Sequence, residues 1–174
     1  QPVTNSASLA VNENLVVASV PVSLTNCPGA SASFSVSASG TELSYQWYKD
    51  GSALSGQTSN SLTFASVSAA DDGLYSVVVT GACGNSVSNS ASLTVNEDLA
   101  ITAVPASATN CPGTSASFSV SATGTGLSYQ WYKGASAIVS QTGSSLVLAN
   151  VSASDAGTYS VVVSGTCGAA VTNS

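Results

Sequence analysis

The sequence predicts an all-β protein of two sandwich domains in tandem, stacked end to end. A strand-like segment occurs twice without change, at Tyr45–Lys49 and Tyr129–Lys133, and holds the only two tryptophans of the chain. An Asp-x-Gly-x-Tyr turn follows each copy, and it ends at Tyr75 and Tyr159. Between these landmarks, apolar residues alternate with polar ones at the period of half-buried strands.

An internal repeat with a constant offset of 84 residues sets the domain organisation. Cys27, Trp47, Tyr75 and Cys83 recur as Cys111, Trp131, Tyr159 and Cys167. A unit of this size is large enough for one sandwich with its own apolar core. We therefore predict one domain at 15–97 and a second at 98–174 that lacks most of its last strand. Residues 1–14 are expected to be the final strand of a preceding or neighbouring domain.

The elements follow from alternation and from turn residues, taken in chain order. After a strand-like run from Leu15, the first domain is expected to contain strands at Ser33–Ala38, around Trp47, and at Ser61–Phe64, Leu74–Thr80 and Ser86–Val95. Turns are expected at Asn26–Gly29, Gly40–Glu42, Lys49–Gly51, Ala69–Gly73 and Gly81–Gly84. The second domain repeats this order from Leu99. A linker of only Asn96–Asp98 predicts restricted bending between the domains.

Composition excludes several classes of function. Two basic residues, Lys49 and Lys133, stand against eight acidic ones, and the net charge is −6. So little positive charge cannot neutralise phosphates, so nucleic acid and anionic membranes are not expected partners. No apolar run is long enough to predict a membrane span. Four cysteines at repeated positions, without histidine for a zinc site, indicate disulfides and an extracellular or cell-surface location.

The two motifs together resemble the immunoglobulin superfamily. Tyr-x-Trp-Tyr-Lys-Asp-Gly at 45–51 and Asp-x-Gly-x-Tyr-x-Val at 71–77 are most similar to intermediate-set domains and to tandem repeats of bacterial surface proteins. The resemblance implies two tandem immunoglobulin-like β-sandwich domains. The core disulfide of that family is replaced here by valines, so the expected core is all apolar. Its expected members are Trp47, Val36, Val77 and Tyr75, and then Trp131, Val120, Val161 and Tyr159.

No residue pattern predicts an enzyme, a cofactor or a strong metal site. The chain has no histidine, and no nucleophile stands beside a base. Glu97 and Asp98 in the linker are weak calcium candidates, because calcium needs six or more oxygens. Tyr45 and Tyr48 could form a sugar platform only if both faced solvent, and alternation places them on opposite faces of their strand.

The cysteines are expected to pair across the junction between the domains. Within one domain, Cys27 and Cys83 lie beyond opposite ends of strands that point the same way. They are then too far apart for a disulfide, which needs α-carbons within about 7 Å. In an end-to-end stack, Cys27 approaches Cys167. We predict a Cys27–Cys167 disulfide, with Cys83 and Cys111 joined to neighbouring modules.

The two ends of the chain are complementary, which predicts head-to-tail assembly with neighbouring copies of the module. Ala7–Val11 reads as a last strand, and the second domain stops before its own. Either the chain is a window of one long polypeptide, or separate subunits exchange a strand, as in donor-strand pili. Because Val3–Ser6 duplicates Val171–Ser174, the continuous polypeptide is favoured.

The expected function is therefore a structural segment of an extracellular rod or filament, serving spacing, adhesion or filament formation. The alternative is a ligand-binding surface module, with glycan or protein as the ligand. A glycan binder would expose clustered aromatic residues, whereas a spacer would keep its few aromatics in the core.

Overall fold

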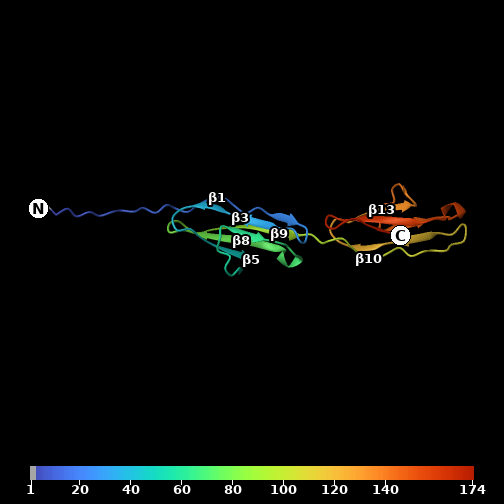
Figure 1. Ribbon diagram of the computed structural model, residues 1–174, viewed down its shortest axis with the longest axis horizontal. Coiled ribbons are helices and arrows are strands. Elements are labelled where there is room, and N and C mark those ends of the chain that lie inside the picture. The colour runs from blue at the N-terminus through green and yellow to red at the C-terminus, as the bar shows by residue number, and fades with distance from the viewer. Residues whose placement is uncertain (1–2) are drawn as a thin grey trace. The chain divides into compact units, whose positions relative to one another are not determined.

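A computed structural model describes residues 3–174. The chain divides between Thr94 and Val95 into two compact units, called here module one and module two. The described residues form seventeen β-strands and two short 3₁₀ turns (Figure 1). None of these elements is a helix long and apolar enough to cross a membrane. The all-β, two-domain prediction is confirmed.

Module one contains nine strands and one 3₁₀ turn. They are β1 (Val16–Ser19), β2 (Leu24–Asn26), β3 (Ala32–Ser35), β4 (Ser37–Ser39), β5 (Ser44–Lys49), β6 (Ser52–Ala53), β7 (Ser61–Phe64), η1 (Ala69–Asp71), β8 (Gly73–Thr80) and β9 (Val87–Val95). One sheet has the order β2-β9-β8-β5-β6, and the pairs β1-β4 and β3-β7 form the rest of the sandwich. The expected strand around Ser33–Ala38 is interrupted at Val36, so that β3 pairs with β7 and β4 pairs with β1.

Module two contains eight strands and one 3₁₀ turn. They are β10 (Ala100–Ala103), β11 (Ala116–Ser119), β12 (Ser121–Thr123), β13 (Ser128–Lys133), β14 (Ser136–Ala137), β15 (Ser145–Leu148), η2 (Ala153–Asp155), β16 (Tyr159–Ser164) and β17 (Val171–Asn173). Its larger sheet has only four strands, in the order β14-β13-β16-β17. No described strand corresponds to β2, and β17 is much shorter than its counterpart β9.

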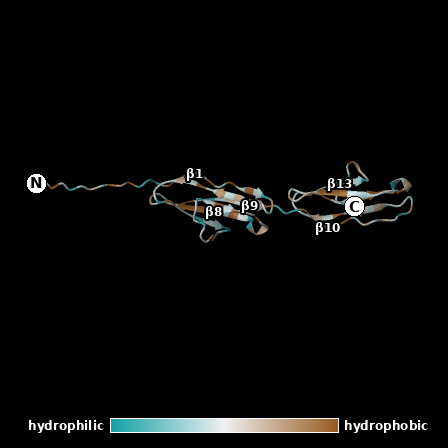
Figure 2. Ribbon diagram, viewed as in Figure 1, coloured by the Kyte–Doolittle hydropathy of each residue, from teal (hydrophilic) through white to brown (hydrophobic). Residues whose placement is uncertain are grey.

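The core of each module is built from residues that face inward from both layers. Trp47 and Trp131 have no exposed surface, and each is paired in register with a fully buried valine, Val77 or Val161. The indole nitrogen of Trp47 donates a hydrogen bond of 2.9 Å to the carbonyl of Ser59. Figure 2 shows apolar residues recurring along the strands of both modules. The alternation in the sequence is thus the alternation of inward and outward side chains.

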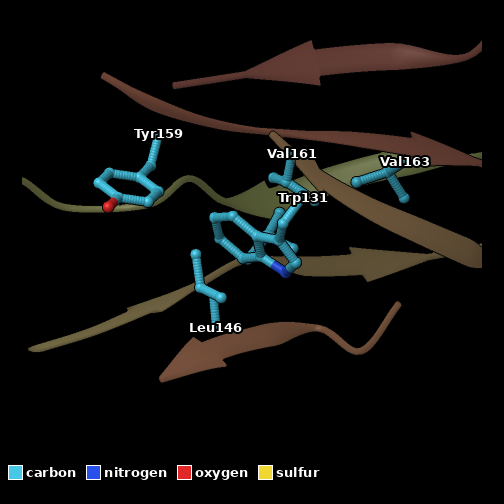
Figure 3. Close-up of a cluster of buried hydrophobic side chains, with 6 residues drawn as sticks. Trp131, Leu146, Tyr159, Val161 and Val163 are labelled. Atoms are coloured by element: carbon cyan, nitrogen blue, oxygen red, sulfur yellow. The ribbon is translucent and has the colours of Figure 1, made fainter. Parts of the chain in front are cut away.

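In module two, the buried cluster consists of Val120, Trp131, Leu146, Tyr159, Val161 and Val163 (Figure 3). Val120 and Val161 occupy the places where the resembling family has its core cysteines, and both are buried. In module one, the equivalent Val36 is also buried, with 2% of its surface exposed. Tyr75 is buried in module one and is in contact with the ring of Phe34, 5.2 Å away between centroids.

Residues 3–13 form no strand, although the sequence predicts a last strand there. Val3, Leu9 and Val11 are each more than 80% exposed. Regular pairing begins only at Asn14, which forms a parallel bridge with Cys83. Gln1 and Pro2 lie outside the described residues.

Candidate functional site

A tyrosine corner closes each module at the start of the strand that follows the 3₁₀ turn. The hydroxyl of Tyr75 donates to the carbonyl of Asp71 at 2.8 Å, and Tyr159 makes the same bond to Asp155. The carboxylate of Asp71 accepts hydrogen bonds from the backbone N–H and the hydroxyl of Ser68, both at 2.8 Å. This aspartate therefore caps the turn, which accounts for its recurrence without a metal.

Near the corner, burial and hydrogen bonds shift the pKa values of two groups in opposite directions. Burial, and then the carboxylate of Asp71, raises the pKa of Tyr75 to about 12. In module two, hydrogen bonds from the backbone N–H and then the hydroxyl of Ser152 hold the pKa of Asp155 below its usual value. At neutral pH Tyr75 is therefore protonated and Asp155 is ionised.

The four cysteines are in two different states. Cys27 and Cys167 are disulfide-bonded. Cys83 and Cys111 are free thiols. Equivalent positions in the two modules, Cys27 and Cys111, therefore differ in state, although their local sequences are closely similar.

Within module one, Cys27 and Cys83 lie at opposite ends. Gly29, beside Cys27, donates a hydrogen bond to Val67, next to the corner where β8 begins. Cys83 follows the far end of β8, where its carbonyl accepts a hydrogen bond from Leu15. A strand of the length of β8 spans roughly 23 Å, so these two cysteines are too far apart for a disulfide.

Glu97 and Asp98 are held by the backbone of module two. The N–H of Glu97 donates to the hydroxyl of Thr125 at 2.8 Å, and its carbonyl accepts from the Thr125 N–H at 3.1 Å. Asp98 forms a parallel bridge with Cys167. Among residues 3–174, no group of three or more His, Cys, Asp or Glu side chains could hold a metal ion.

The sequence analysis did not identify the threonine that holds the segment before the first strand of each module. Thr41 in module one makes the same two bonds to Glu13 that Thr125 makes to Glu97. The one sequence signal for this contact is that both residues, Glu13 and Thr41, recur 84 residues later. These two bonds hold the backbone of Glu13 and Glu97, just before the first strand of each module.

The aromatic residues do not form an exposed platform. Tyr45 and Tyr48 are both half-buried, as are their counterparts in module two. The exposed large hydrophobic residues of the described chain are all valine or leucine. The arrangement that a stacked sugar ring requires is therefore not seen on the described surface.

A concave feature lies beside β16 of module two. Two cavities of about 310 and 370 Å³ share Ala108, Phe118, Gly157 and Tyr159 in their walls. The first also contacts Ala116 and Leu148, and the second contacts Ser107 and Ser174. We call these two adjoining cavities the groove. Its lining mixes apolar side chains such as Phe118 and Leu148 with polar ones such as Asn110, Ser152 and Asp155.

The model of the family described as "Immunoglobulin domain" matches residues 1–95, and that described as "PKD-like domain" matches residues 98–174. No curated protein sequence matches the chain.

Solved structures of tandem immunoglobulin domains share the fold. The I-band fragment I67–I69 from titin is 20% identical, with a TM-score of 0.75, over 95% of this chain and 64% of the fragment. Sidekick-1 immunoglobulin domains 1–4 are also 20% identical, with a TM-score of 0.75, over 96% of this chain and 49% of that one. Extracellular domains 3–5 of Drosophila OTK are 19% identical, with a TM-score of 0.63, over 93% and 60%. The chain thus spans less than two thirds of each fragment.

Proposed function

Since the chain belongs to the immunoglobulin domain family, we propose that it is a structural segment of an extracellular rod or filament built from tandem modules. Such a segment spaces or joins its neighbours and carries out no reaction. The observation that carries this proposal is the use of the aromatic side chains. Trp47, Trp131 and Tyr75 are buried in the cores, and the large hydrophobic residues exposed on the surface of residues 3–174 are valines and leucines, not aromatic residues.

The proposed rod is linked by a disulfide between Cys27 and Cys167. Three observations support this pairing: the bonded state of these two cysteines, the free thiols of Cys83 and Cys111, and the positions of Cys27 and Cys83 near opposite ends of β8. In the rod, the modules stack end to end, and Cys83 and Cys111 link the segment to the preceding and following modules. Because disulfides persist in oxidising compartments, they support a location at the cell surface or outside the cell.

Peptide mapping without reductant tests this proposal. We expect a peptide that contains Cys27 to be linked to one that contains Cys167, and the link to be lost in Cys27→Ser. The matched control, Cys83→Ser, should keep it. A linked pair of Cys27 and Cys83 peptides would overturn the rod with cross-module disulfides.

A further inference from the structure

In module two, β15 lies at an open edge of its sheet. It pairs with β11 over its whole length, and no described strand pairs with its other side. Proteins commonly protect such an edge with charged residues, proline or a bulge. Here the register with β11 is regular, and neither a charged residue nor a proline occurs between Lys133 and Asp155. The edge of β15 is therefore open to a further strand.

The direction of the free backbone groups on β15 follows from its register. The N–H of Val120 donates to the carbonyl of Ser144 at 2.9 Å, in the same register in which β11 pairs with β15. Residues that bond to the neighbouring strand alternate with residues that do not. The N–H and C=O groups of Ser145 and Val147 thus point away from β11, toward the open edge.

This edge is more apolar in module two than in module one. Val147 on β15 is 61% exposed, and Val139 in the loop before it is 85% exposed. The equivalent residues of module one, on β7 and in the loop before it, are Thr63 and Ser55. On the inner side of β15, Leu146 is buried in the core. An exposed valine therefore lies beside unpaired backbone groups, and a pairing strand would contact both.

Charge indicates which strand fits this edge. Each chain has a net charge of −6, so two copies repel one another over most of their surfaces. The uncharged segment between Lys133 and Asp155 adds nothing to this repulsion, and it offers no charge to a partner of opposite sign. We propose that β15 pairs antiparallel with β15 of a second copy of this chain.

Two-fold symmetry lets β15 satisfy its own free backbone groups. With Leu146 opposite Leu146 of the second copy, Ser145 of each copy lies opposite Val147 of the other. Because these are the residues whose backbone groups point outward, each such pair exchanges N–H···O=C bonds. The two valine side chains lie diagonally to one another on the outer face. The contact is self-complementary and closes at a dimer, so it joins two chains side by side.

This lateral contact goes beyond the proposed rod, and it depends on no disulfide. Sedimentation velocity over a range of concentrations tests it, on a chain that carries Cys83→Ser and Cys111→Ser so that free thiols cannot link copies. We expect a concentration-dependent dimer.

A matched pair of substitutions tests which edge forms the dimer. Val147→Lys should weaken dimerisation at least about tenfold, because it places like charges diagonally across the strand pair. Thr63→Lys adds the same charge at the equivalent edge of module one and should leave the dimer unchanged. Both substituted side chains lie on the exposed side of their strands, so both variants should keep the fold.

Hydrogen exchange locates the contact independently. The amides of Ser145 and Val147 should gain protection as the concentration rises, whereas the corresponding amides of Ser61 and Thr63 in module one should not. A chain that stays monomeric at all concentrations would overturn the inference. Equal effects of the two lysine substitutions, or a dimer without added protection at Ser145 and Val147, would also overturn it. Each of these results leaves the proposed rod standing, because the disulfide map is obtained separately.

Discussion

Module one and module two share their core tryptophan, tyrosine corner and entry threonine, yet only module one has a complete larger sheet. Its last strand, β9, buries Leu93 and lies beside β2, whereas the equivalent of β2 in module two has no strand structure. The start of the strand after the corner also differs, since β8 begins at Gly73 and β16 begins only at Tyr159. The comparison teaches that the last strand organises one edge of the sandwich, while the central core forms without it.

The largest expected effect follows removal of either core indole. Trp47→Ala and Trp131→Ala should each destabilise their own module by about 3–5 kcal/mol, because both side chains are fully buried. Circular dichroism follows urea unfolding of the substituted module, and the fluorescence of the one remaining tryptophan reports the other module. Loss of stability in both modules from one substitution would show that they do not fold as separate units.

Leu93→Ala should make module one resemble module two. We expect a loss of about 2–5 kcal/mol, since Leu93 is buried beneath the last strand. Unfolding of module one, followed by Trp47 fluorescence in a Trp131→Phe background, measures this. Thr94→Ala, on the exposed side of the same strand, is the control. Equal effects of both substitutions would contradict the role given to the buried face of β9.

Alkaline pH should lower the stability of module one through Tyr75. Its pKa is raised to about 12 in the folded state, against an ordinary value of 10.0. The folded state therefore binds the proton more tightly, so the stabilisation is complete below pH 10 and is lost as the pH rises toward 12. Unfolding titrations between pH 9 and 12 should show this decline, and Tyr75→Phe should flatten it. An unchanged slope in that variant would exclude Tyr75 as the source.

Low pH should have the smallest effect on the free energy of unfolding. Part of this effect should occur in module one only. Asp50 accepts a hydrogen bond of 2.9 Å from the Leu74 N–H and forms an ion pair with Lys49, and these hold its pKa below 3.8. Its contribution is present above that value and is lost as the pH falls through the lower, folded-state pKa. Module two has Gly134 at this position. Asp50→Asn should reduce the acid sensitivity of module one only, as followed by unfolding between pH 2 and 5.

The fold was predictable from the sequence because its signals are local. Alternation predicted the strand at Ser61–Phe64 with the bounds that the structure has, and the Asp-x-Gly-x-Tyr turn predicted the corner. The interruption at Val36 was not predictable, because alternation continues through it while the strand changes partners.

The groove could not be predicted from the sequence as a site. Its walls come from segments far apart in the chain, and their residues, Phe118 and Tyr159 among them, read as ordinary core positions. The last strand predicted at Ala7–Val11 is not formed in the structure. Alternation of apolar and polar residues predicts that a segment can be a strand, but it does not predict the neighbouring strand with which the segment pairs. The calcium candidates Glu97 and Asp98 and the Cys27–Cys167 pairing remain predictions.

Hydrogen exchange at the start of the two equivalent strands tests the central comparison most directly. The chain is measured with and without a copy of residues 91–97 added after Ser174. Without the addition, the amides of Gly157–Tyr159 should exchange much faster than those of Gly73–Tyr75, because only the latter segment lies beside a complete last strand. With it, the two segments should be protected alike. Equal protection before the addition, or no gain after it, would contradict the account.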